Sequence, residues 1–213
     1  MITTIIFDLD GLLADTEGLH FQSYREVLAQ HGVDVNLAQY IEHWIRRGQG
    51  VTAWAEEHGL TLDVPLIRKQ KFARYQELVQ ASVQPMPGAV EVLRRLHSAY
   101  RLALASASHG NSVLWVLNCL SITHYFDNIL SGDDVQRAKP FPDIFLKSAQ
   151  NLNVDPSECL VLEDAERGVR AAHNAEMKCI AIPNQYTREQ DFSLATCVVT
   201  SLHDVTPELL ATI

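Results

Sequence analysis

From residue 86 onward the chain alternates short apolar runs with stretches of helical spacing. Runs of this kind, rich in Ile, Val, Leu and Ala, are typical of strands buried on both faces. They are Thr3–Phe7, Leu102–Ala105, Asn128–Leu130, Cys159–Leu162, Cys179–Ile182 and Cys197–Val199, and the helical stretches are Ala89–Ala99, Asn111–Leu120, Pro142–Leu152, Glu166–Ala175 and Pro207–Ile213. Because strand–helix–strand crossovers are right-handed, the alternation predicts an α/β fold with a doubly wound parallel sheet.

Residues 15–85 show a different pattern, with long amphipathic helical stretches and no convincing strand. Helices are expected at Leu19–His31, Leu37–Arg47, Val51–His58 and Pro65–Ala81, and Trp44, Trp54 and Tyr75 are expected to pack between them. The Pro- and Gly-containing stretch 84–88 suits a linker. We therefore expect an α-helical domain, residues 15–85, inserted into an α/β core of residues 1–14 and 86–213.

Charge and composition exclude several classes of partner. The chain is 47% hydrophobic with a net charge of -9, which opposes nucleic-acid phosphates and anionic membrane surfaces. No apolar run approaches the roughly 18 residues that a membrane span requires. Asp8 and Asp10 stand where a signal peptide would have its apolar stretch. We expect a cytoplasmic monomer with no nucleic-acid or membrane partner.

The four cysteines, Cys119, Cys159, Cys179 and Cys197, form no Cys-x-x-Cys pair. Each lies in an apolar stretch, which favours a buried packing role over a metal or redox role. We expect all four to behave as small apolar core residues.

Polar residues follow four of the predicted strands. Ligands of a doubly wound sheet bind beyond the carboxyl ends of its strands. The residues at these ends are Asp8, Asp10, Ser106, Ser108, Lys139, Glu163 and Asp164. Singly, each residue also fits a turn, a helix cap or a solvated charge. A cluster of acids repels itself and is stabilised by a hard divalent cation, and oxygen donors without nearby His or Cys favour Mg²⁺ over zinc.

Carboxylates, a hydroxyl and a lysine at one sheet edge suit the transfer of a phosphoryl group, whose oxygens need several positive or hydrogen-bonding partners. An aspartate can act as the nucleophile and form an acyl phosphate. A second aspartate two residues later can give a proton to the leaving oxygen and then take one from water.

These residues resemble the four motifs of the haloacid dehalogenase superfamily, in the same order and at the same strand ends. The motifs are Asp8-Leu9-Asp10-Gly11-Leu12-Leu13-Ala14-Asp15-Thr16-Glu17, then Ser106, then Lys139-Pro140 with Pro142-Asp143-Ile144-Phe145, then Glu163-Asp164 with Gly168. The resemblance spans nearly the whole chain. It implies a Rossmann-like core with an α-helical cap domain inserted after the first motif.

The resemblance also implies roles for the residues of the first motif. Asp8 resembles the nucleophile that becomes phosphorylated and a metal ligand, and Asp10 resembles the general acid/base whose backbone carbonyl also binds Mg²⁺. Dehalogenases of the superfamily lack an aspartate at the second position and its transport ATPases carry threonine there. Asp10 therefore implies phosphate ester chemistry.

The remaining motifs supply the other expected site residues. Ser106 resembles the hydroxyl that holds the phosphoryl oxygen, and Lys139 resembles the lysine that neutralises nucleophile and phosphate. Asp164, helped by Glu163, resembles the remaining Mg²⁺ ligands.

Within the superfamily the chain most resembles the β-phosphoglucomutase-like group of phosphatases and mutases. The run Leu104-Ala105-Ser106-Ala107-Ser108 is similar to the second motif of that mutase, and Asp164-Ala165 to its fourth. His20 and Lys71 fall where the group keeps substrate-facing polar residues. We expect Ala107, Ser108, His20 and Lys71 to help bind substrate, beside Ser106 and Lys139.

Two departures separate the chain from the mutase. His109 stands where the mutase has a basic residue, and the cap reads Arg46-Arg47-Gly48-Gln49-Gly50-Val51 where the mutase has an arginine beyond a Lys-Gly turn. Arg47 and His109 remain candidates for substrate binding. A mutase must hold two phosphates at once, and the residues that would hold the second one are altered or missing in this chain. We therefore expect a Mg²⁺-dependent phosphatase acting on a small phosphorylated metabolite such as a sugar phosphate; the alternatives are a phosphomutase and a catalytically inactive phosphate-binding protein.

Overall fold

Six parallel strands form one sheet in the order β3-β2-β1-β4-β5-β6. The strands are β1 (Thr4–Phe7), β2 (Arg101–Ala105), β3 (Asn128–Leu130), β4 (Cys159–Glu163), β5 (Lys178–Ala181) and β6 (Cys197–Val198) in the computed structural model, which describes residues 1–213. The chain adds β2 and β3 on one side of β1 and the later strands on the other side. This confirms the doubly wound parallel sheet and puts the switch point of the strand order beside β1.

The register of the central strands decides which residues meet beyond them. Phe7, at the end of β1, lies opposite Leu104 of β2 and Leu162 of β4. Residues that follow these three strands therefore leave the sheet at the same edge. The expected strands are all present, and each observed end lies within one residue of the predicted one.

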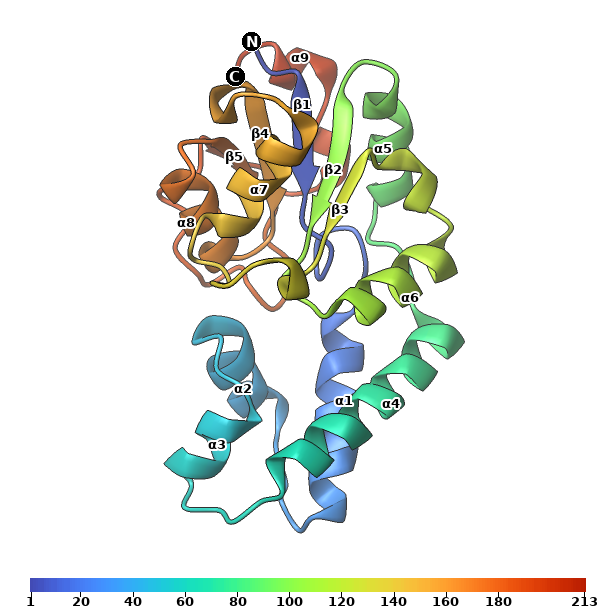
Figure 1. Ribbon diagram of the computed structural model, residues 1–213, viewed down its shortest axis with the longest axis vertical. Helices are drawn as coiled ribbons and strands as arrows, with labels where there is room; N and C mark the ends of the chain where they lie inside the picture. Colours follow the sequence, from blue (N-terminus) through green and yellow to red (C-terminus); the bar gives the residue numbers. More distant parts are fainter. The chain divides into compact units, whose positions relative to one another are not determined.

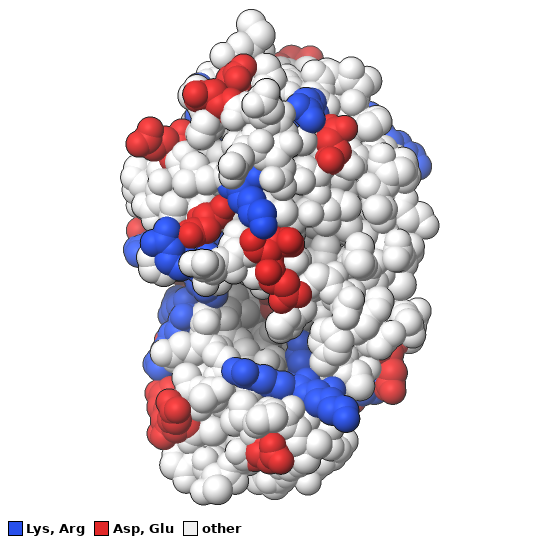
Figure 2. Space-filling model, in the orientation of Figure 1, with Lys and Arg blue, Asp and Glu red and all other residues white.

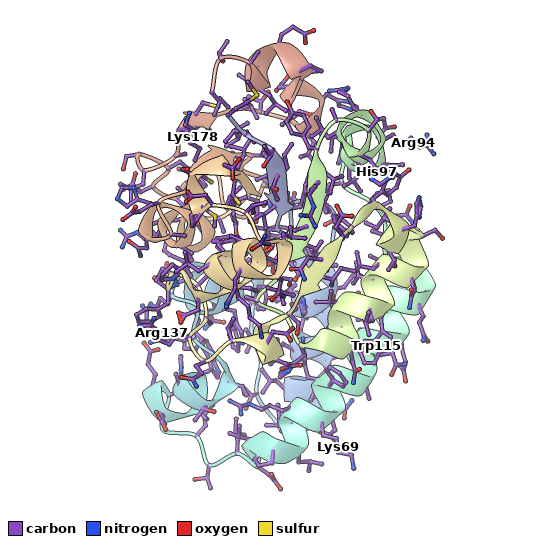
Figure 3. The ribbon with its side chains drawn as sticks, turned by 45° about the horizontal axis from the view of Figure 1, so that its top comes forward. Lys69, Arg94, His97, Trp115, Arg137 and Lys178 are labelled. Atoms are coloured by element: carbon purple, nitrogen blue, oxygen red, sulfur yellow. The ribbon has the colours of Figure 1, made fainter.

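Helices cover the sheet on both faces. They are α5 (Ala89–His97), α6 (Gly110–Leu120), α7 (Asp143–Leu152), α8 (Glu166–Asn174) and the short α9 (Pro207–Leu210). In Figure 1, α7 and α8 lie in front of the sheet, and both chain ends lie near α9. Phe145 of α7 and Val169 of α8 pack in one buried cluster with Ile6 and Val161 of the central strands. Arg137, labelled in Figure 3, forms a surface ion pair of 2.9 Å with Asp143 at the start of α7.

Residues 16–83 form a second unit that is entirely helical. Its elements are α1 (Glu17–Gln30), α2 (Leu37–Tyr40), the π-helix η1 (Ile41–Arg46), α3 (Val51–Glu57) and α4 (Val64–Ser82). The core of this unit includes Leu28, Tyr40 and Ile67, with Trp44 packed against it at its margin. Trp54 and Tyr75 are buried, as expected from the sequence. We call this unit the cap domain.

The prediction of a single helix at 37–47 is wrong in one respect. This segment is a turn of α-helix followed by a π-helix. The amide of Arg47 donates to the carbonyl of Glu42, five residues back. Within this wider turn His43 is buried, and its Nε2 lies 3.2 Å from the carbonyl oxygen of Gly50. Helical spacing alone does not distinguish a π-turn from an α-turn.

The remaining unit comprises residues 1–15 and 84–213. The boundaries therefore fall one or two residues from those expected.

Two of the four expectations about cysteine are wrong. Cys159 and Cys179 are buried, but Cys197 is only half-buried and Cys119 is exposed. Cys197 lies on the edge strand β6, and Cys119 lies on the outer side of α6.

The surface mixes charges of both signs. On the face shown in Figure 2, Lys and Arg side chains are interspersed with Asp and Glu. No helix combines the length and the apolar character that a membrane crossing needs.

Candidate active site

A buried lysine lies where the ends of the central strands meet. The Nζ atom of Lys139 donates to Asp8 Oδ1 at 2.6 Å, to Glu163 Oε1 at 2.7 Å and to the carbonyl oxygen of Ala105 at 2.9 Å. Its three protons therefore each have an acceptor. The ammonium also lies 4.9 Å from the ring centroid of Phe145. Burial opposes the charged form, but the two carboxylates raise the pKa of Lys139 above its ordinary value, so the group stays charged.

Asp8 follows β1 directly, and its amide continues the ladder by donating to Leu162 at 3.0 Å. Its side chain is buried. Burial is the main reason that the pKa of Asp8 is raised to about 8; Glu163 and Asp10 add to the increase, and Lys139 opposes it. The ionised form that a nucleophile needs is thus disfavoured until further positive charge reaches this carboxylate.

Glu163 ends β4 and is held from both sides. Its Oε1 accepts from Lys139, and its Oε2 accepts from the backbone amides of Asp164 at 3.0 Å and Ala165 at 3.2 Å. Space for this carboxylate depends on Gly168 of α8, since a Cβ there would overlap the carboxylate atoms. The structure therefore makes Glu163 a partner of Lys139 in addition to any contact with a metal.

Asp10 is fixed by the loop that follows β2. Its Oδ2 accepts from the Ser106 hydroxyl at 3.0 Å and from the Ser108 hydroxyl at 2.7 Å. Ser106 Oγ in turn accepts from the amide of Ser108 at 3.0 Å. The segment expected to hold a phosphoryl oxygen is thus joined directly to the expected acid/base.

The donor set fits a hard divalent cation. Carboxylate oxygens of Asp8, Glu163 and Asp164 lie within 4.8 Å of one another, and all three residues are buried. Lys139 bonds to two of the three, Asp8 and Glu163. A group of buried carboxylates, in which oxygen is the donor element, is the environment that Mg²⁺ favours.

Other expected substrate-binding residues of the core unit are more exposed. Ala107 is exposed at the turn after Ser106. His109 is 74% exposed, and its Nδ1 lies 2.8 Å from Asp133 Oδ1. The second oxygen of Asp133 accepts from the amide of Gly110 at the start of α6.

The other three residues expected to bind substrate belong to the cap domain, where they lie in two separate places. Lys71 Nζ lies 2.8 Å from His20 Nδ1 and 4.6 Å from the ring centroid of Tyr75, on which the His20 ring stacks. Arg47 is bonded elsewhere, to Glu42 at 3.1 Å and to Glu57 at 3.1 Å. The structure therefore joins His20 with Lys71 and keeps Arg47 in a separate surface ion-pair network.

The motif residues and the fold agree with a family comparison. Residues 5–182 match the model of the haloacid dehalogenase-like hydrolases. The chain belongs to this family.

Relatives in the family include phosphatases and a mutase. The chain is 32% identical over 184 residues to the fructose-1-phosphate phosphatase YqaB of Escherichia coli (strain K12), a match that covers 84% of this chain and 95% of YqaB. A CbbY variant from Rhodobacter sphaeroides, solved with xylulose-(1,5)bisphosphate, is 30% identical over 96% of both chains with a TM-score of 0.86. A β-phosphoglucomutase from Clostridium difficile is 27% identical, covers 100% of this chain and 96% of its own, and has a TM-score of 0.83.

One polar contact of this hydrolase site was not expected from the sequence. Asn184, three residues beyond β5, donates to Asp164 Oδ2 at 2.8 Å and to the carbonyl oxygen of Gly11 at 3.0 Å. The polar run after β5 was a signal of the same kind as those after β1 and β4. Asn184 belongs to none of the four motifs, however, and an Asn after a strand is common in turns.

Gly168 gives a first test of the packing in this site. We expect Gly168→Ala to lower the free energy of unfolding by about 3 kcal/mol, because the new methyl group overlaps the Glu163 carboxylate. Urea denaturation measures the loss. Gly50→Ala is the control, since a Cβ there meets no atom within 4 Å, and we expect a change within about 1 kcal/mol. Equal stability of the two variants would show that α8 can shift away from Glu163 freely.

A second test concerns the buried ion pairs. We expect Lys139→Met to destabilise the fold by about 3–5 kcal/mol, because Glu163 then keeps a buried charge without its partner and Asp8 loses the cation that lowers its pKa. Adding Glu163→Gln should recover more than about 1 kcal/mol of this loss, since it removes the charge of Glu163 that has lost its partner. Urea denaturation of both variants and of Glu163→Gln alone completes the cycle. If the losses of unfolding free energy in the two single variants simply added up in the double variant, Lys139 and Glu163 would not be energetically coupled.

Proposed function

We propose that this chain is a Mg²⁺-dependent phosphatase that hydrolyses a small phosphorylated metabolite, of the sugar phosphate class, through a phosphorylated Asp8. The observation that carries the proposal is the buried contact of Lys139 with both Asp8 and Glu163, beside Asp164. The names of two relatives support the substrate class, one as a phosphatase of fructose 1-phosphate and one as a binder of xylulose 1,5-bisphosphate.

The first step joins Asp8 to phosphorus. A carboxylate oxygen of Asp8 attacks, an acyl phosphate O–P bond forms, and the bond from phosphorus to the ester oxygen breaks. Lys139, already within 2.6 Å of Asp8, offsets the negative charge that gathers around the transferring group. The Ser106 hydroxyl and the Lys139 ammonium are the donors that we assign to the phosphoryl oxygens.

Asp10 moves the protons. Protonated at first, it gives its proton to the leaving oxygen, and as a carboxylate it then takes a proton from the water that attacks the phosphorus of phospho-Asp8. The hydroxyls of Ser106 and Ser108 hold its side chain at the sheet edge. Asp8 is regenerated, and inorganic phosphate leaves.

The metal residues follow from the donor set. We assign Asp8, Asp164 and the backbone carbonyl of Asp10 as Mg²⁺ ligands, and Glu163 as an acidic neighbour that also anchors Lys139. When bound, the cation supplies the positive charge that favours ionised Asp8 and neutralises phosphoryl oxygens. His20 and Lys71 of the cap domain, and Ala107, Ser108 and His109 of the core unit, are assigned to the rest of the substrate. Arg47 would have to leave Glu42 and Glu57 to take part.

Replacement of Asp8 tests the mechanism. We expect Asp8→Asn to lower phosphate release from a panel of phosphorylated sugars, alcohols, glycolate and nucleotides by more than about a thousandfold, because an amide is a poor nucleophile. Removal of Mg²⁺ with a chelator should abolish release by the unaltered protein, and added Mg²⁺ should restore it. Circular dichroism checks that the variant is folded.

A matched change at the opposite edge of the sheet provides the control. Asp155 precedes β4 and caps the short helix η4 (Pro156–Glu158), so Asp155→Asn also turns a carboxylate into an amide. We expect its activity to stay within about twofold of the unaltered protein. Phosphate release that persists in Asp8→Asn, or that the chelator leaves unchanged, would refute the mechanism.

A phosphomutase is the second candidate, favoured by the likeness to β-phosphoglucomutase over the whole chain. The two functions differ in the fate of the phosphoryl group. We expect sugar phosphates to yield inorganic phosphate in amounts equal to the free sugar, with no change of phosphate position, measured by ³¹P NMR. Conversion of β-glucose 1-phosphate to the 6-phosphate without phosphate release would instead establish the mutase.

A further inference from the structure

Asn184 is the polar residue of the site that the four motifs leave out. It lies in the loop after β5, the next strand beyond β4 in the sheet. Its Nδ2 atom donates both hydrogens, one to Asp164 Oδ2 at 2.8 Å and one to the Gly11 carbonyl oxygen at 3.0 Å. A single amide group thus connects the loop after β4 to the loop after β1.

The orientation of this amide is determined by its own loop. The Oδ1 atom of Asn184 accepts from the amide of Tyr186 at 2.7 Å. The backbone amide of Asn184 donates to the Thr187 hydroxyl at 3.0 Å, and Thr187 is fully buried. Since an oxygen must face the Tyr186 N–H group, the NH₂ group must face Asp164 and Gly11. The side chain has no alternative orientation that satisfies the same partners.

The approach of the two loops is close enough to depend on a glycine. Gly11 has φ of +82°, and a Cβ there would lie 2.6 Å from Asn184 Nδ2 and 2.6 Å from Asp164 Oδ2. Gly11 therefore provides both the left-handed backbone and the space for the amide. Gly11 also follows Asp10 directly, so a bond to its carbonyl restrains the peptide next to the carbonyl that we assign to Mg²⁺.

We propose that Asn184 is a positioning residue for the metal site, which holds the Asp164 carboxylate and the Asp10–Gly11 backbone in the arrangement that receives Mg²⁺. The inference rests on the proposed function. Asn184 donates to one oxygen of Asp164 and so fixes the direction in which the carboxylate presents its other oxygen. Partners of metal ligands act in this way, and their removal weakens metal affinity by about 10–100-fold.

The test is the Mg²⁺ affinity of the whole chain, measured by isothermal titration with MgCl₂ alone. We expect Asn184→Leu, which keeps the size of the side chain and removes its hydrogen bonds, to raise the Kd for Mg²⁺ by about tenfold or more. Activity should recover at high Mg²⁺, so that the change falls on the Mg²⁺ requirement rather than on kcat. Asn184→Ser, a smaller change, is titrated in the same way and decides the question if the Leu variant does not fold.

Asn174→Leu is the matched control, since Asn174 donates a single bond of 3.0 Å to the Pro140 carbonyl on the surface of the same unit. Its Kd should stay within twofold of the unaltered protein. An unchanged Kd in the folded Asn184 variants, even with a loss of stability toward urea in chelator, would overturn the inference and leave the proposed function intact. Failure of the unaltered protein to bind Mg²⁺ at all would overturn both.

Discussion

The ammonium of Lys139, enclosed between the carboxylates of Asp8 and Glu163, is the interaction on which the rest of the site depends. A buried charge is tolerated only where partners and hydrogen bonds replace its water, and here every proton of the ammonium has an acceptor. The ion pairs join segments more than 20 residues apart in sequence. The same contact therefore stabilises the fold and places positive charge beside the candidate nucleophile.

This arrangement follows from the order of the strands. With β1 at the centre, Asp8 has β2 on one side and β4 on the other, so Ser106 and Glu163 reach the same edge without long loops. The helices that return the chain must then pass close to the site. Gly168 shows how close α8 lies to the site, because a side chain at this position would overlap the Glu163 carboxylate. Packing and chemistry thus constrain the same residues.

Sequence reasoning predicted the sheet and the meeting of Asp8 with Lys139, because buried strands have a distinct pattern and their carboxyl ends share one edge. It did not predict the role of Asn184, since a contact between two loops depends on their backbone paths and not on local pattern. The π-helix at 41–46 has the same apolar spacing as an α-helix over so short a length. Cys119 was misplaced because an apolar neighbourhood does not show which side of a helix faces the sheet.

Under the proposed function, the contact of Ser106 with Asp10 connects substrate binding to proton transfer. A hydroxyl has one hydrogen, and in this structure that of Ser106 is directed at Asp10 Oδ2. Under the proposed function the same hydrogen serves a phosphoryl oxygen, so the arrival of the phosphoryl group takes one of the two hydroxyl bonds from Asp10. The bond from Ser108, which is the shorter at 2.7 Å, keeps the carboxyl group at the sheet edge. The arriving phosphoryl group therefore changes the hydrogen bonds of the carboxyl group that, under the proposed function, gives its proton to the leaving oxygen.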